Sequence, residues 1–314
     1  MNIDRRHAIA AAGSVLLNAT VMRLALSQPS PLLASRSREV QTLFSDAARI
    51  GLDKPRAAGT VSALDLAELV DDALALGPAN DNAGIIANRA GLLLSELTRD
   101  ERDGLAIEEP APAAPRTMTP VMEQEYRDLF ASARVRDTAR VELTKVARFI
   151  TSDRAKQRYK EVEADTKVPW FVVGAIHYRE ANLNFLGHLH NGDPLMLRTV
   201  HVPENRPPAP WPKPDLTPQK LWRESARDAL RRFEIATAWT LPSICFFMEG
   251  YNGFGCRDNG IHSPYLWNYT QYYTRGGFPR DHFFSADYVS KQAGLMSVLV
   301  AIRELSPTEI VFAP

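Results

Sequence analysis

Apolar residues recur with helical spacing in the first third of the chain. Residues three and four positions apart lie on one face of a helix, so this spacing predicts several short helices over residues 35–105. The region holds no cluster of His, Cys or carboxylate residues with the spacing of a site. The apolar positions are Leu64, Leu66, Leu69, Val70, Ala73 and Leu74, followed by Ile85, Ile86, Leu92, Leu93, Leu94 and Leu97.

A stretch rich in proline and alanine then interrupts the helical pattern. Residues 106–119 include Pro110, Pro112 and Pro115 and have the composition of a linker. Helical spacing resumes at Pro120, and Pro169 opens a strongly apolar helix, since proline suits the first turn, where an amide N–H has no partner. The pattern therefore predicts a helical amino-terminal region and a larger domain over residues 120–305.

A small β-hairpin is expected after this apolar helix. Asn191-Gly192 is a strong hairpin signal, and residues 195–202 could form the strand behind it. Seven prolines between residues 203 and 218 then predict an extended excursion. We expect further helices near Pro218, near Pro242, and from Ser285, as N-cap, to about Leu305. The predicted fold class is mainly α with one small sheet.

Charge and the amino-terminal residues narrow the function. Lys plus Arg and Asp plus Glu both total 37 among 314 residues, so the net charge gives no general attraction to nucleic acid. Arg5-Arg6 precedes a mostly apolar stretch and a small-residue site ending at Ser27. Residues 1–27 therefore read as an export signal, and the paired arginines suggest the twin-arginine route. We expect a periplasmic or secreted protein.

The chain has two cysteines, Cys245 in an apolar segment and Cys256 in a glycine-rich turn. An oxidising compartment would allow a disulfide. Eleven residues do not fix the distance between the two sulfur atoms, and we favour two separate thiols.

Glu180 is the strongest candidate for a catalytic residue. Its spacing from Trp170, Val173 and Ile176 places it on the apolar face of the helix, near the negative end of the helix dipole. Burial and the dipole both favour the protonated carboxyl, and glycoside cleavage needs such an acid to protonate the departing sugar oxygen. The spacing alone is equally compatible with an ordinary Glu at a helix end.

Asp193 could supply the second carboxylate that a glycoside hydrolase requires, with Thr199 beside it on the following strand. An Asp before a proline is also common in turns, and threonine is at home in any strand.

Five segments of the sequence carry a resemblance to a known group. Residues 168–180 and 188–195, which contain Glu180 and the His-Asn-Gly-Asp run, resemble the active-site region of bacterial and phage lysozyme-like proteins. Residues 249–253, with Tyr251-Asn252, look like the Tyr-Asn motif of soluble lytic transglycosylases and goose-type lysozymes. Residues 263–267 and 289–294 are similar to later segments of the same group.

The resemblance covers roughly residues 120–305 and implies a lysozyme-like α+β domain that cleaves peptidoglycan glycan strands without a cofactor. It implies that Glu180 is the general acid, and the six-residue interval from Asp193 to Thr199 matches the pair that positions water in phage-type lysozymes. The interval from Glu180 to Asp193 is longer than in that pattern. The substrate contacts that we expect are His190, Tyr251, Asn252, Tyr265 and Trp267.

Three alternatives stay open. A lytic transglycosylase would use Glu180 alone and leave 1,6-anhydro ends. A non-catalytic peptidoglycan-binding or scaffold protein would keep the cleft without turnover. His177, His188, His190 and His201 could also form a metal site, as in a zinc peptidase, although they lack a tight helical His-x-x-x-His pair.

Overall fold

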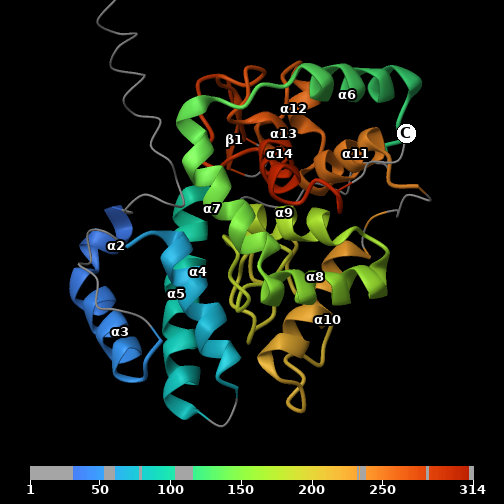
Figure 1. Cartoon of the computed structure of the whole chain (residues 1–314). Helices are drawn as coiled ribbons and strands as arrows, with labels where there is room; N and C mark the ends of the chain where they lie inside the picture. Colours follow the sequence, from blue (N-terminus) through green and yellow to red (C-terminus); the bar gives the residue numbers. More distant parts are fainter. Residues whose placement is uncertain are drawn as a thin grey trace, which may run out of the picture.

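The computed structural model describes residues 31–52, 61–77, 80–102, 116–231, 233, 238–280 and 283–310. The predicted export signal and residues 106–115 of the predicted linker lie outside these ranges. The described amino-terminal part is helical, as the apolar spacing predicts, and α4 and α5 lie side by side (Figure 1). Its helices are α2 (Pro31–Ser35), α3 (Ser37–Arg49), α4 (Ala63–Ala75) and α5 (Asp81–Arg102).

The larger part is also mainly helical and carries a two-stranded antiparallel sheet. Its elements begin with α6 (Pro120–Ser132), the 3-10 turn η2 (Asp137–Ala139), α7 (Arg140–Thr151), α8 (Asp153–Thr166), α9 (Trp170–Ala181) and α10 (Pro218–Leu230). They continue with α11 (Leu241–Asn252), α12 (Gly255–Asp258), α13 (Pro264–Trp267), β1 (Gly277–Arg280), β2 (Phe283–Ser285) and α14 (Leu295–Leu305).

Three helices of the larger part begin where the sequence signals place them. Pro169 is the N-cap of α9, as expected from its place before the apolar run. Thr217 and Thr240 cap α10 and α11, and each side-chain oxygen accepts a backbone N–H of the first turn, with a proline directly inside each helix. The predicted helices near Pro218 and Pro242 are therefore confirmed.

The strand predicted over residues 195–202 is wrong, although the turn before it forms. The His188 N–H donates to the Asp193 carbonyl over 2.8 Å, and Gly192 takes a φ of +79°. Beyond Pro194 the backbone N–H groups of Val200 and His201 donate to the Asp193 carboxylate and not to a neighbouring strand. The described sheet is instead β1 paired with β2, where Gly277 faces Ser285.

The start predicted for the last helix is also wrong. Ser285 ends β2, and α14 begins ten residues later, at Leu295. The intervening segment binds the chain around α13, because the Asn268 side chain donates to the carbonyls of Ser290 and Gln292. A helix over these residues would use the same carbonyls for its own hydrogen bonds.

Helix α9 is the centre of the molecule. It lies between α14 and α8 in Figure 1 and also packs against α7, α11 and α5. Nearly all of its side chains are buried, which suits a helix that is apolar all round.

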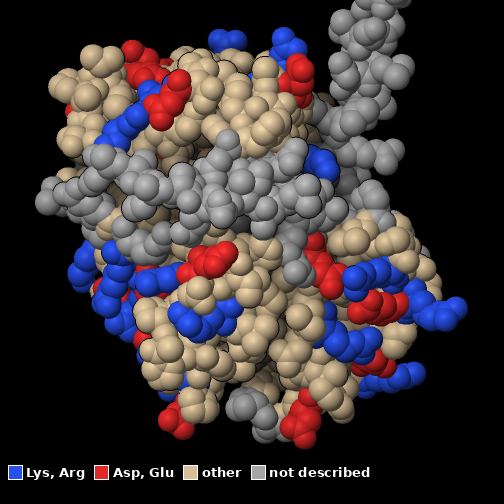
Figure 2. Space-filling model, turned by 180° about the vertical axis from the view of Figure 1, so that it is seen from behind, with Lys and Arg blue, Asp and Glu red and all other residues tan. Residues whose placement is uncertain are grey.

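Acidic and basic side chains are interspersed over the face of the molecule that is turned away from the viewer in Figure 1 (Figure 2). Among the described residues, no helix combines the length and apolar character needed to cross a membrane.

Candidate active site

Glu180 lies in the last turn of α9, and only 5% of its surface is exposed. The helix ends directly after it, where Asn182 and Leu183 take positive φ angles of 49° and 62°. Asparagine is one of the few residues that adopt this left-handed conformation readily, so the sequence stops the helix at this point. The position predicted for Glu180, at the buried end of a central helix, is confirmed.

Tyr265 holds the Glu180 carboxyl. It belongs to the short helix α13, whose first turn is capped by Ser263, and its hydroxyl donates to Glu180 Oε1 over 2.7 Å. Burial, the negative charge of Glu180 and their hydrogen bond together raise the pKa of Tyr265 well above its ordinary value. The phenol therefore keeps its proton and serves as a permanent donor to Glu180.

Tyr251 stands beside this pair. Its hydroxyl donates to the carbonyl of Leu189 over 2.8 Å, and its ring stacks on Phe233 at 4.8 Å. Tyr251 is also one of the groups that raise the pKa of Tyr265, as expected when two tyrosine hydroxyls are neighbours. Asn252, by contrast, is exposed at the end of α11. The structure thus brings Tyr265 to Glu180, places Tyr251 near Tyr265, and binds Tyr251 to the hairpin turn.

The two later segments of the resemblance meet at the end of α9. Arg179 donates to the carbonyl of Gln292, and the Ala293 N–H donates to the Tyr178 hydroxyl. A Cβ atom on Gly294 would lie 2.4 Å from the Leu266 carbonyl oxygen, so only glycine allows this approach. Residues 263–268 and 289–294 therefore form one joined wall behind Glu180.

Asp193 is buried, and its carboxylate organises the loop that follows the turn. It accepts the N–H groups of Val200 and His201 over 2.8 and 3.0 Å, and His201 Nδ1 lies 2.7 Å from its other oxygen. Burial raises the pKa of Asp193, but the hydrogen bonds from His201 and Val200 outweigh it, and the net shift is downward. Asp193 is thus a charged group whose oxygens already bind the loop.

Thr199 takes part in the same loop. Its hydroxyl donates to the carbonyl of Pro203 over 2.5 Å and accepts the N–H of Arg206 over 2.8 Å. The buried hydroxyl therefore closes a tight turn over residues 199–206.

The histidines of the metal hypothesis have separate partners. His177 contacts the Tyr159 hydroxyl, His188 contacts Ser225, His190 contacts Asp228 on α10, and His201 contacts Asp193. Within the described ranges, no group of three or more His, Cys, Asp or Glu side chains is arranged to hold a metal ion. The predicted substrate contact His190 is thus a buried partner of Asp228.

Trp267 is buried and lines a polar cavity of about 180 Å³. The cavity is also lined by Glu125, Glu249 and Arg257, none of which is among the predicted catalytic or substrate-binding residues. Glu249 accepts the Tyr126 hydroxyl over 2.5 Å and pairs with Arg257, which also binds Glu125. The sequence signal for this cluster is Glu249 itself, a carboxylate within the apolar helix α11, because a buried charge needs partners. Glu180 is not in this lining.

Both cysteines are buried and free, as favoured from their spacing. Burial is the largest cause that raises the pKa of Cys256, to about 11, and it also raises the pKa of Cys245. Neither thiol is activated as a nucleophile.

No family model, curated protein or solved structure matches the chain. The functional argument therefore depends on the residues and their geometry.

Proposed function

We propose that the protein cleaves the glycan strands of peptidoglycan at the bond between N-acetylmuramic acid and N-acetylglucosamine, with Glu180 as general acid. The observation that carries the proposal is the buried Glu180 carboxyl at the end of α9, oriented by the Tyr265 hydroxyl. A fixed carboxyl in a water-poor setting is the group that protonates a departing glycosidic oxygen.

The role of Glu180 follows from its surroundings. Tyr265 donates to one carboxyl oxygen and keeps its proton, so this hydrogen bond orients the Glu180 carboxyl. Tyr251 links the same corner to the turn at Leu189. Fixed orientation of an acid toward the scissile bond supplies a large part of the rate enhancement in enzymes.

In the hydrolytic form of the proposal, Asp193 positions the attacking water with support from Thr199. This role requires a carboxylate that stays charged, and the lowered pKa of Asp193 supports it. Substrate binding would also have to release one carboxylate oxygen from Val200 or His201. Export to the periplasm or the medium would bring the enzyme to this substrate.

A lytic transglycosylase is the second candidate, and one observation favours it. Both Asp193 oxygens bind residues 200–201 of the loop, so neither is available to position a water molecule. A mechanism that uses Glu180 alone does not need Asp193. In this form the substrate's own hydroxyl attacks the sugar carbon, and the product carries a 1,6-anhydro end.

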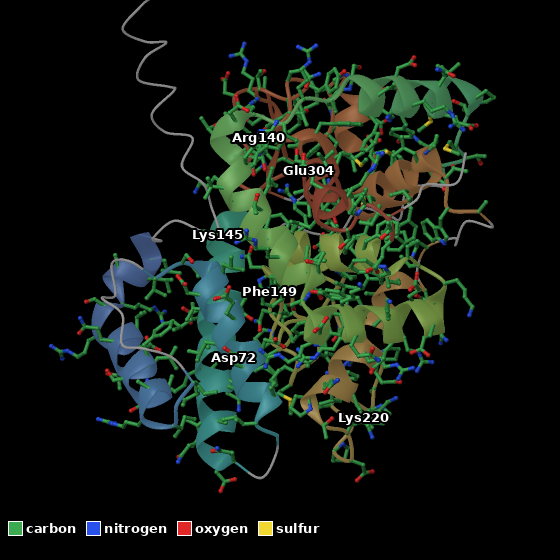
Figure 3. The ribbon with its side chains drawn as sticks, in the orientation of Figure 1. Asp72, Arg140, Lys145, Phe149, Lys220 and Glu304 are labelled. Carbon is green, nitrogen blue, oxygen red and sulfur yellow. The ribbon has the colours of Figure 1, made fainter. Side chains whose placement is uncertain are left out.

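The test is digestion of purified peptidoglycan by the wild type, Glu180→Gln and Asp193→Asn, with released muropeptides identified by mass spectrometry. Glu304→Gln is the control, because Glu304 is an exposed carboxylate on α14, the helix that packs on α9 (labelled in Figure 3). Reducing ends that require both Glu180 and Asp193 would establish hydrolysis. Anhydro ends that require Glu180 alone would establish the transglycosylase. Glycan binding without release by the wild type would refute cleavage and favour a binding protein.

A further inference from the structure

Helix α5 of the amino-terminal region touches the chain directly after Glu180. The Asn184 side chain donates to the Gly91 carbonyl on α5 over 3.0 Å, while its own oxygen accepts the Leu186 N–H over 2.9 Å. Asn184 is fully buried, so the loss of either hydrogen bond would destabilise the folded protein. The loop that ends the catalytic helix is thus fixed to a helix nearly a hundred residues earlier in the chain.

Gly91 permits this approach. A Cβ atom at this position would lie 3.0 Å from Leu186 Cβ and 3.2 Å from Leu186 Cδ1, tighter than ordinary contacts, and 3.4 Å from the Asn184 side-chain oxygen. Gly84 lies two turns earlier in the same helix, and a Cβ atom there would meet nothing within 4 Å. The two glycines differ in their contact with the loop and share the same helix.

A second link runs through Arg158 on α8. Its guanidinium lies 4.2 Å from the centre of the Phe185 ring and pairs with the buried Asp71 of α4 over 2.5 Å. Phe185 in turn packs on His177, one turn before Glu180 on α9, with ring centres 4.6 Å apart. Both α4 and α5 therefore reach the end of α9 through residues 184–186.

We infer that the α4–α5 pair is a positioning element for Glu180, acting through the Gly91 contact with Asn184 and Leu186. This inference rests on the proposed glycan cleavage. It gives the amino-terminal helices a role inside the catalytic unit: Gly91 and Asn184 set the path of the loop that follows Asn182, and this loop holds in place the end of α9 that carries Glu180.

The experiment compares Gly91→Ala with Gly84→Ala in the full chain. Both substitutions favour the helix, because alanine has a higher helix propensity than glycine. Only Gly91→Ala places a methyl group in close contact with Leu186 of the loop. We expect Gly91→Ala to lower kcat on peptidoglycan about tenfold or more, with KM within about twofold of the wild type, because a small misplacement of a catalytic group is costly. Gly84→Ala should leave both constants unchanged. Asn184→Ala should act in the same direction as Gly91→Ala.

Hydrogen exchange gives a readout that does not depend on activity. Amides of residues 177–187 should exchange faster in Gly91→Ala and Asn184→Ala than in Gly84→Ala, while α11 should be unchanged, because exchange reports local opening. Failure of the wild type to release glycan fragments would refute the proposed function, and the exchange comparison would still decide whether α5 fixes this loop. Equal kcat for the two glycine variants, or equal exchange of residues 177–187, would overturn the inference.

Discussion

The buried ion pair between Asp71 on α4 and Arg158 on α8 allows a sharp test of how the amino-terminal helices are attached. The side chains of Asp71 and Arg158 are 6% and 7% exposed, and their atoms lie 2.5 Å apart. The neighbouring pair, Asp72 with Arg154, is 41% and 48% exposed (Asp72 is labelled in Figure 3). Arg154 also lies 3.2 Å from the second carboxylate oxygen of Asp71. Asp71→Asn and Asp72→Asn therefore make the same chemical change one residue apart, at a buried and at an exposed site.

The two changes should differ several-fold in free energy. Removing one partner of a buried pair leaves an uncompensated charge and costs about 3–5 kcal/mol. An exposed pair contributes about 0–1 kcal/mol, because water screens both charges. With a urea dependence of about 1–3 kcal/mol per molar, Asp71→Asn should lower the unfolding midpoint by about 1 M or more.

The assay is urea unfolding followed by tryptophan fluorescence and far-ultraviolet circular dichroism. A double variant, Asp71→Asn with Arg158→Met, keeps an apolar stem over Phe185 and removes both charges, so it should be more stable than Asp71→Asn alone. Equal midpoints for Asp71→Asn and Asp72→Asn, or a double variant less stable than the single one, would refute the reasoning.

Three more predictions follow from single contacts. Tyr265→Phe should lower kcat on peptidoglycan about tenfold or more by releasing Glu180, and a rate equal to wild type would contradict the orienting role. Burial lowers the pKa of His177 to about 3, so the unfolded state binds its proton first as pH falls. The free energy of unfolding should decrease from pH 6.5 toward pH 3, and His177→Phe should flatten that slope in chemical unfolding. Gly174→Ala would place a Cβ atom 2.6 Å from Ile150 and should cost about 1–3 kcal/mol in a thermal melt, whereas an unchanged melt would show that the core yields.

Periodicity and capping residues predict most of the helical architecture. Pro169, Thr217 and Thr240 mark helix starts because their effects act within one turn, and local sequence holds all the information required. Glu180 could be placed for the same reason, since the apolar face of α9 is continuous from Trp170. By contrast, β1 contains Gly277 and Pro279, which weaken any strand signal, so the sheet was assigned to the wrong segment.

The partners of the candidate site could not be read from spacing. Tyr265 reaches Glu180 across 85 residues, and Asn184 reaches Gly91 across 93. The sequence predicts Asp193 as a second carboxylate close to Glu180, yet its oxygens bind loop N–H groups whose directions depend on the turn at Thr199. Such contacts depend on tertiary packing, which a one-dimensional pattern does not contain.

The hydrogen bond from Tyr265 to Glu180 also has a consequence for biosynthesis. Ribosomes deliver Gly91 first, then Glu180, and Tyr265 last, so a nascent chain can dock α9 on α5 well before the hydroxyl that orients its acid exists. A truncated product that stops before residue 265 would lack that hydroxyl. Under the proposed function, the contact that orients Glu180 can therefore form only after Tyr265 has been synthesised.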